Sequence, residues 1–407
     1  MTEKWKTDKW YVSPWNFADE VTKDFVFKDK IKFHDVTLRD GEQQAGIVFT
    51  KDEKVNIAEK LAEAGVHRIE AGMPAVSKSD EMAIKEIVKR KLGPEVFAFC
   101  RCMVDDVKRA LDCGVDGIVI EIPSSDHMIK YAYRWELEKA IRLSIESTQF
   151  AKENGLYTVF FPIDATRADV DWFLDLIVKI EKEGHMDALA VVDTFGVLAP
   201  HTVPYLIKKI KERVSKPLET HFHDDFGCGA ANTLMALAAG ADVAHTTVTG
   251  IGERAGNAPY EEIALSLKLL YGVDTGIKTE KFFEISKYVQ ECSRLTVRPN
   301  RQIVGPTVFN IESGIIADWL NNAWPDHKLE VTPFLPEIVG QKDPEIVLGK
   351  NSGIPSVEKW LEKLGLPAVD SKEKKLELVM AVKDASFVKK GLLNEEDFKA
   401  VCQKVLG

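Results

Sequence analysis

Two histidines in the second half of the chain, His221 and His223, are separated by one residue and end a short run of apolar character. In an extended strand, residues i and i+2 point to the same face, so we expect both imidazoles on one side of the strand. Two imidazoles joined by a carboxylate form a ligand set that suits a divalent ion, and Asp40 offers that carboxylate. The alternative interpretation is an ordinary pair of core histidines, which the pair alone does not exclude.

Polar side chains also follow other short apolar runs of the chain. Arg39 precedes Asp40, and a guanidinium beside a metal ion stabilises an enolate or a developing alkoxide. Glu70 and Glu121 end two further runs, and we predict that they contact substrate or hold Arg39 in an ion pair. Asn257 offers an amide oxygen as a further ligand. Zinc, manganese and magnesium all tolerate such a mixed site.

Two further residues are candidates for substrate contacts. Arg101 directly follows the third run. Thr194 directly follows the sixth, and its hydroxyl is expected to bind a substrate carboxylate. Capping of the next helix is the alternative role for Thr194. Cys100 and Cys102 have no second Cys or His pair nearby in the sequence, so we interpret them as structural residues.

The elements that must position these residues form a repeat of strands and helices. Short apolar runs, typical of parallel strands buried on both faces, alternate with amphipathic segments. The runs are residues 32–37, 67–71, 96–100, 117–122, 158–162, 188–193, 218–223 and 243–247. Eight such units predict a closed (β/α)8 barrel of the TIM type, whose functional residues gather at the carboxyl ends of the strands. An open doubly wound sheet is the alternative, but the first strand lacks the glycine-rich turn of a dinucleotide-binding fold.

The repeat covers residues 31–274, which we predict to be the catalytic domain. Residues 275–407 are expected to form a mainly helical subdomain, and residues 1–30 an N-terminal arm. The arm is rich in large aromatic residues that would pack on the body or on a second subunit, so we predict a homodimer. The expected helices of the subdomain are residues 278–291, 312–322, 357–364 and 372–389.

Composition narrows the class of partner. The net charge is −10, which disfavours a nucleic acid or an anionic membrane surface as a partner. The sequence contains no uncharged apolar stretch of about 18 residues, so we expect no transmembrane helix. The N-terminus lacks the apolar core of a secretory signal. The 6 cysteines are scattered, which argues against a disulfide framework and favours a reducing cytoplasm. We therefore expect small-molecule substrates.

Three motifs in order resemble those of the metal-dependent Claisen-condensing barrel family. They are TLRDGEQ at residues 37–43, HFHDD at residues 221–225 and GIGERAGN at residues 250–257. That family includes isopropylmalate, homocitrate and citramalate synthases, and hydroxymethylglutaryl-CoA lyases are its relatives. The resemblance implies that Asp40, His221 and His223 ligate one divalent metal ion, with Asn257 nearby.

The resemblance also implies an activity. Arg39 and Gln43 would lie at the reacting end of the substrate, and Thr194 on its carboxylate. An acyl-CoA, acting as co-substrate, would be enolised by a base and would attack the keto carbon of a 2-oxo acid. Hydrolysis of the thioester would follow.

The chain departs from the family pattern at the residues linked to proton transfer. Ile163 and Ile316 stand where the synthases carry a Glu and a His. Isoleucine cannot move a proton, so we predict another base, with His127 as the candidate and a solvent-facing loop histidine as its alternative role. Two alternative functions stay open. One is an aldolase or carbon–carbon lyase acting on a metal-chelated 2-oxo or 2-hydroxy acid, and the other is a protein that has lost catalysis.

Overall fold

The computed structural model of this chain describes residues 3–407. Its contacts divide the chain into two compact units. One unit is Pro14–Val297, and the other joins the segment up to Ser13 to Arg298–Gly407. The site predicted from the sequence lies in the first of these units.

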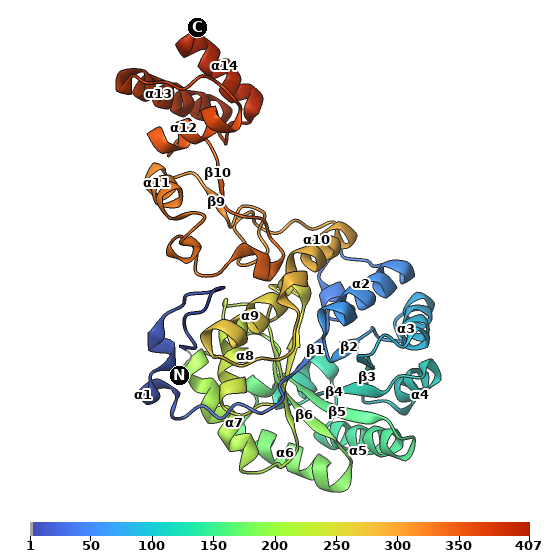
Figure 1. The fold of residues 1–407 in the computed structure, drawn as a ribbon. Helices are drawn as coiled ribbons and strands as arrows, with labels where there is room; N and C mark the ends of the chain where they lie inside the picture. Colours follow the sequence, from blue (N-terminus) through green and yellow to red (C-terminus); the bar gives the residue numbers. More distant parts are fainter. Residues whose placement is uncertain (1–2) are drawn as a thin grey trace. The chain divides into compact units, whose positions relative to one another are not determined.

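Parallel strands form a closed barrel in the first unit, as Figure 1 shows. They follow one another in chain order, and β1 pairs with both β2 and β8, which closes the ring. The strands are β1 (Lys32–Asp35), β2 (Arg68–Glu70), β3 (Glu95–Arg101), β4 (Gly117–Pro123), β5 (Tyr157–Ile163), β6 (Ala188–Asp193), β7 (Leu218–Phe222) and β8 (Val243–Thr246). The predicted (β/α)8 barrel is therefore confirmed.

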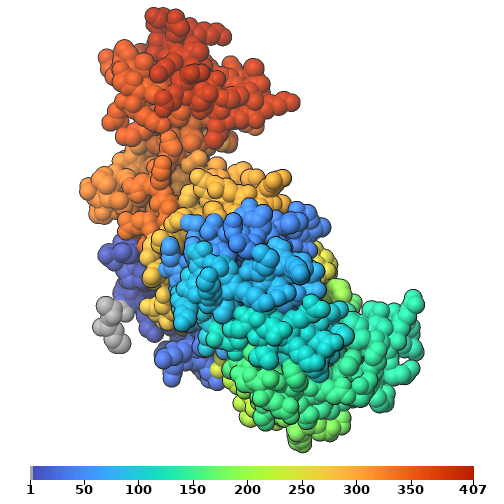
Figure 2. Space-filling view, turned by 90° about the vertical axis from the view of Figure 1, so that its right-hand side faces the viewer, coloured from blue at the N-terminus to red at the C-terminus, as the bar shows by residue number. Residues whose placement is uncertain are grey.

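An α-helix follows each strand and covers the outside of the barrel. The first of these helices shows how the local sequence sets both ends: Thr50 and Glu53 form a reciprocal capping box, and Gly65 ends the helix at φ 87°. The helices are α2 (Lys51–Ala64), α3 (Lys78–Arg90), α4 (Val104–Cys113), α5 (Leu137–Glu153), α6 (Val170–Glu183), α7 (Val203–Lys211), α8 (Gly229–Ala238) and α9 (Tyr260–Leu270). Figure 2 shows α2 to α5 side by side, in chain order, on one face of this unit.

The interior of the barrel has an apolar side and a polar side. The apolar side belongs to β3–β6 and consists of Phe97, Phe99, Val119, Val159, Phe161, Ala188, Ala190 and Val192. The polar side belongs to the neighbouring strands β7, β8, β1 and β2. Its buried side chains are His34, Arg68, Glu70, Glu219, His221 and His245. The candidate ligands lie on or directly after strands of the polar side, so buried polar side chains of the same strands lie next to the candidate metal centre.

The packing at both ends of the barrel differs from the expected domain boundaries. The helix α10 (Phe282–Ser293), expected in the C-terminal subdomain, belongs to the barrel unit. The ring of Phe282 is fully buried against that of Tyr260 in α9, with their centroids 5.2 Å apart. This apolar contact explains why the barrel unit extends to Val297 and does not stop at residue 274.

The second unit contains the four helices α11 (Gly314–Ala323), α12 (Ile354–Lys363), α13 (Lys372–Lys389) and α14 (Glu395–Leu406), with two short strands, β9 (Asn310–Ile311) and β10 (Glu345–Ile346). The N-terminal segment joins it through backbone hydrogen bonds. The Tyr11 N–H donates to the Pro333 carbonyl at 2.9 Å, and the Leu335 N–H donates to the Lys9 carbonyl at 2.8 Å. Residues 3–30 are therefore not one arm, because the residues before Pro14 pair with this unit.

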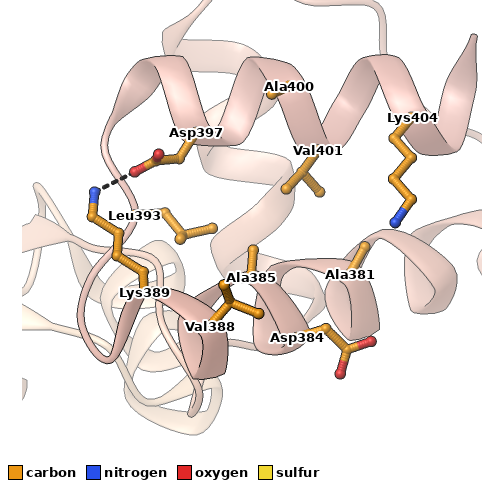
Figure 3. Close-up of a pocket in the computed structure, with 10 residues that line it drawn as sticks. All are labelled: Ala381, Asp384, Ala385, Val388, Lys389, Leu393, Asp397, Ala400, Val401 and Lys404. Atoms are coloured by element: carbon orange, nitrogen blue, oxygen red, sulfur yellow. Dashed lines mark hydrogen bonds and ion pairs between the residues drawn. The ribbon is translucent and has the colours of Figure 1, made fainter.

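A groove of about 610 Å³ lies between α13 and α14, and Figure 3 shows it. Apolar side chains such as Val388, Leu393 and Val401 line it, and an ion pair between Lys389 and Asp397 spans one end.

No helix among residues 3–407 has the length and apolar character that crossing a membrane requires.

Candidate metal centre

Asp40, His221 and His223 converge at the carboxyl end of the barrel. Asp40 follows β1, and His221 lies in β7. Both strands are neighbours of β8, which brings their ends together. The Asp40 Oδ2 atom lies 3.2 Å from His221 Nε2 and 3.8 Å from His223 Nε2, and all three side chains are buried. Ring closure thus places three potential ligand atoms at one point.

The ring proton of His223 is placed by the backbone. His223 lies just beyond β7, and its Nδ1 is 3.1 Å from the Gly256 carbonyl oxygen. A carbonyl oxygen only accepts hydrogen bonds, so Nδ1 must carry the proton. Nε2 is then the ring nitrogen on the side of Asp40 and the one that could bind a metal ion.

The charge states of Asp40 and His221 suit the binding of a cation. Burial by itself raises the pKa of Asp40, but the adjacent Arg39 guanidinium offsets this, and the pKa stays well below its usual range. Asp40 is therefore ionised at neutral pH. Burial lowers the pKa of His221 to about 3, so its ring is neutral and able to act as a ligand.

The residues present fit a divalent ion. Asn257 donates from Nδ2 to Asp40 Oδ1 at 2.9 Å, while its own Oδ1 is buried without a hydrogen-bond partner. An amide turned by half a rotation presents that oxygen to the Asp40 cluster. Gly252 leaves the space for this amide, since a Cβ there would lie 2.2 Å from the Asn257 Nδ2. Two imidazole nitrogens, one carboxylate and one amide oxygen form the mixed donor set of such ions.

Arg39 is held from two sides and keeps one donor free. Its Nε pairs with the fully buried Glu70, and its Nη1 lies 2.8 Å from Asp40 Oδ2 and 3.3 Å from Gln43 Oε1. The remaining Nη2 is buried and has no hydrogen-bond partner. Glu70 is therefore positioned to orient Arg39, and Arg39 has a donor available for a substrate oxygen.

Two other predicted substrate contacts have partners within the protein. Arg101 forms a fork with Asp106, with Nε 2.8 Å from Oδ2 and Nη2 2.9 Å from Oδ1. Glu121 accepts a hydrogen bond from the Tyr133 hydroxyl at 3.1 Å, and burial raises the pKa of Glu121. The structure thus leaves Glu121 within electrostatic reach of Arg39 but directs the Arg101 guanidinium toward Asp106 in helix α4.

His127 and Thr194 meet at a second polar cluster. His127 Nε2 lies 2.9 Å from Asp164 Oδ2 and 3.3 Å from Ser125 Oγ. Asp164 is fully buried, Arg167 binds its carboxylate, and its backbone N–H donates to the Thr194 hydroxyl at 2.8 Å. The Thr194 hydroxyl proton is still available as a donor, and the His127 side chain is 40% exposed. An oriented and accessible imidazole is what a proton acceptor requires.

The two isoleucines of the altered family pattern lie in different units. Ile163 is the last residue of β5, is partly buried and packs against the apolar side of the barrel interior. Ile316 lies in α11 of the second unit and is partly buried. Apolar packing at Ile163 confirms that this position offers no proton acceptor to the mouth.

Three residues of the site were not among those predicted from the sequence. His245 and Glu219 lie in the buried interior next to His221, and Asp164 orients His127. Strand alternation could have found Glu219, because it is two residues before His221 and so shares its face. His245 is a polar residue inside a run expected to be apolar. Asp164 follows the fifth strand, but nothing in its spacing pairs it with His127.

Residues 30–289 match the family model described as HMGL-like. The chain belongs to the HMGL-like family. It is 36% identical over 399 residues to homocitrate synthase AksA of Methanothermobacter thermautotrophicus, covering 98% of this chain and 99% of that protein. It is 38% identical over 381 residues to 2-isopropylmalate synthase of Methanocaldococcus jannaschii, covering 93% of this chain and 72% of that protein.

A solved structure shares the fold of this HMGL-like protein. The HMG-CoA lyase of Bacillus subtilis aligns with a TM-score of 0.61 at 20% identity, over 68% of this chain and 98% of the lyase. At that identity the likeness shows the barrel fold alone. The family expected from the three motifs is confirmed by the family model and by both synthases.

Proposed function

We propose that this protein is a divalent-metal-dependent acyltransferase that condenses an acyl-CoA with a 2-oxo acid. The observation that carries the proposal is the convergence of Asp40 with the imidazoles of His221 and His223 at the mouth of the barrel. The relatives named as synthases, which match nearly the whole chain, support condensation as the reaction.

Asp40, His221 and His223 would hold the ion, with Asn257 as a further ligand, and zinc, manganese and magnesium are the candidate ions. A divalent ion in this site supplies Lewis-acid polarisation of a carbonyl group. Arg39 donates from its free Nη2 to the substrate oxygen that gains negative charge.

The remaining residues bind the substrate or move a proton. Gln43 accepts from Arg39 and keeps the guanidinium in place, and the Thr194 hydroxyl donates to the substrate carboxylate. Glu121, whose carboxylate interacts electrostatically with Arg39, would bind the substrate beside them. His127, oriented by Asp164, takes the proton from the acyl methyl group, a role that Ile163 cannot serve.

The proposal is tested by the release of coenzyme A. Purified protein is incubated with acetyl-CoA, each candidate ion, and 2-oxo acids that carry small, branched apolar or carboxylated side chains, and the free thiol is measured. We expect thiol release that requires both the ion and one class of 2-oxo acid. Cleavage of a 2-hydroxy acid without thiol release would favour the lyase or aldolase instead. A bound ion without turnover on any substrate would contradict both activities.

We also propose that the protein is a homodimer in the cytoplasm. Exposed apolar side chains on α13, including Met380, Phe387 and Val388, support self-association, because solitary chains rarely expose such clusters. The six cysteines are all free thiols, in keeping with a reducing compartment. Light scattering at micromolar concentration should give twice the mass of one chain, and a monomer would contradict the proposal.

A further inference from the structure

A chain of hydrogen bonds runs from His221 down into the barrel. His221 Nδ1 lies 3.3 Å from His245 Nδ1, and His245 Nε2 lies 2.7 Å from Glu219 Oε2. The other carboxylate oxygen of Glu219 accepts from Arg68 at 2.7 Å. All four side chains are buried, so no solvent molecule from the surface competes for these contacts.

The Glu219 carboxylate, at the end of this chain of hydrogen bonds, determines where the ring proton of His245 lies. The Glu219 carboxylate, in an ion pair with Arg68, only accepts hydrogen bonds, so His245 must carry a proton on Nε2. With its proton on Nε2, His245 has Nδ1 available to accept a hydrogen bond from His221 Nδ1, which lies 3.3 Å away. In the metal-free chain the ionised Asp40 carboxylate, 3.2 Å from His221 Nε2, is a second acceptor for the His221 proton. An ion bound at Nε2 would leave that proton on Nδ1, where His245 is its acceptor.

We propose that Glu219 and His245 are positioning residues that hold His221 in the tautomer required of a metal ligand. This inference rests on the proposed function in one respect, because it takes Asp40, His221 and His223 to bind a divalent ion. His223 receives the same tautomer from the Gly256 carbonyl. Two different hydrogen-bond partners, the Gly256 carbonyl and the His245 ring, are therefore placed to hold the Nδ1 protons of the two candidate ligands.

The same proton assignment decides the role of a second buried cluster. His34, Glu219 and His245 lie close enough together to be considered as ligands of an ion of their own. However, an ion on His245 Nε2 would move the His245 proton to Nδ1, which could then no longer accept the Nδ1–H of an ion-bound His221 at 3.3 Å. We therefore take the cluster at Asp40 as the ion site and His245 as the hydrogen-bond partner of its ligand His221.

Substitutions at His245 test the proposal through metal affinity, measured by competition with a chromophoric chelator and without any substrate. His245→Leu removes the acceptor for His221 Nδ1–H and is expected to weaken metal affinity by about 10–100-fold. His245→Gln is expected to restore most of the affinity, because its carboxamide oxygen can accept from His221 while its nitrogen donates to Glu219.

A matched control lies beside His245 in the same interior. His34 stacks on His245 with ring centroids 4.3 Å apart and is equally buried, but it does not belong to the hydrogen-bond chain that reaches His221. His34→Leu should therefore leave metal affinity within about twofold of the wild type, although it makes the same change of side chain. Equal losses in His34→Leu and His245→Leu would overturn the proposal, since packing alone would then explain both.

A measurement on the unaltered chain covers the case in which these variants do not fold. The imidazole 15N shifts of the zinc-loaded protein, assigned by comparison with His221→Ala, should show His221 protonated at Nδ1 and His245 protonated at Nε2. A His221 ring protonated at Nε2 would overturn the proposal. Both readouts are independent of turnover, so absence of coenzyme A release would count against the proposed function and not against this inference.

Discussion

His223→Ala is expected to lose the divalent ion and to lower turnover by about a thousandfold or more. The substitution removes one of the two imidazole nitrogens that face Asp40, and the ion is expected to supply several kcal/mol of stabilisation to the developing oxyanion. The Gly256 carbonyl also loses one hydrogen bond, which we expect to cost about 1 kcal/mol of folding stability, but it keeps the one from the Asp224 N–H at 3.0 Å. The barrel should therefore stay folded.

The metal content of His223→Ala is measured by elemental analysis after dialysis, and its fold by circular dichroism. The exposed His201 provides the control, because His201→Ala removes the same side chain outside the candidate site. That variant should keep both its ion and its turnover. A full equivalent of tightly bound ion in folded His223→Ala would show that His223 is not a ligand.

Arg39→Lys is expected to keep the ion but to lower kcat by about 100–1,000-fold, the usual effect of losing one preorganised donor to an oxyanion. Arg39 contacts Glu70, Asp40 and Gln43 through two of its nitrogens and keeps Nη2 free. A lysine has one nitrogen, which cannot serve the internal partners and a substrate oxygen together. KM for the 2-oxo acid should change less than kcat.

Steady-state kinetics and metal content together check this result. Arg142→Lys is the matched control, since Arg142 forms an exposed ion pair with Glu146 on α5 and should tolerate the exchange. If Arg39→Lys retained kcat within about threefold, the role of the free Nη2 would be refuted. If it lost the ion as His223→Ala does, Arg39 would act by supporting the metal ligands instead.

Local patterns in the sequence were enough to predict the barrel and the members of the candidate metal centre. The strand repeat implies a ring, and in a ring the ends of the first and seventh strands lie on either side of the eighth. That topological relation brings Asp40 to His221 and His223 without any knowledge of side-chain packing. The spacing of the two histidines places both on one face, because alternation along a strand is a property of the backbone.

Domain boundaries were less predictable. The apolar stripe of α10 has the same periodicity whether it packs on the barrel or on another helix, so only the contact between Phe282 and Tyr260 assigns it. The pairing of the N-terminal segment with residues 333–335 is equally non-local, because backbone hydrogen bonds leave no mark in side-chain pattern.

The order of residues along the chain is sufficient to tell which groups are available: an aspartate, two histidines and an arginine at the ends of strands that must converge. The partner of each group became known only from the folded barrel, such as Glu70 behind Arg39, Asp164 behind His127 and His245 behind His221. This difference arises because a hydrogen bond depends on distances of a few ångströms between atoms far apart along the chain. Those distances exist only after the barrel has closed.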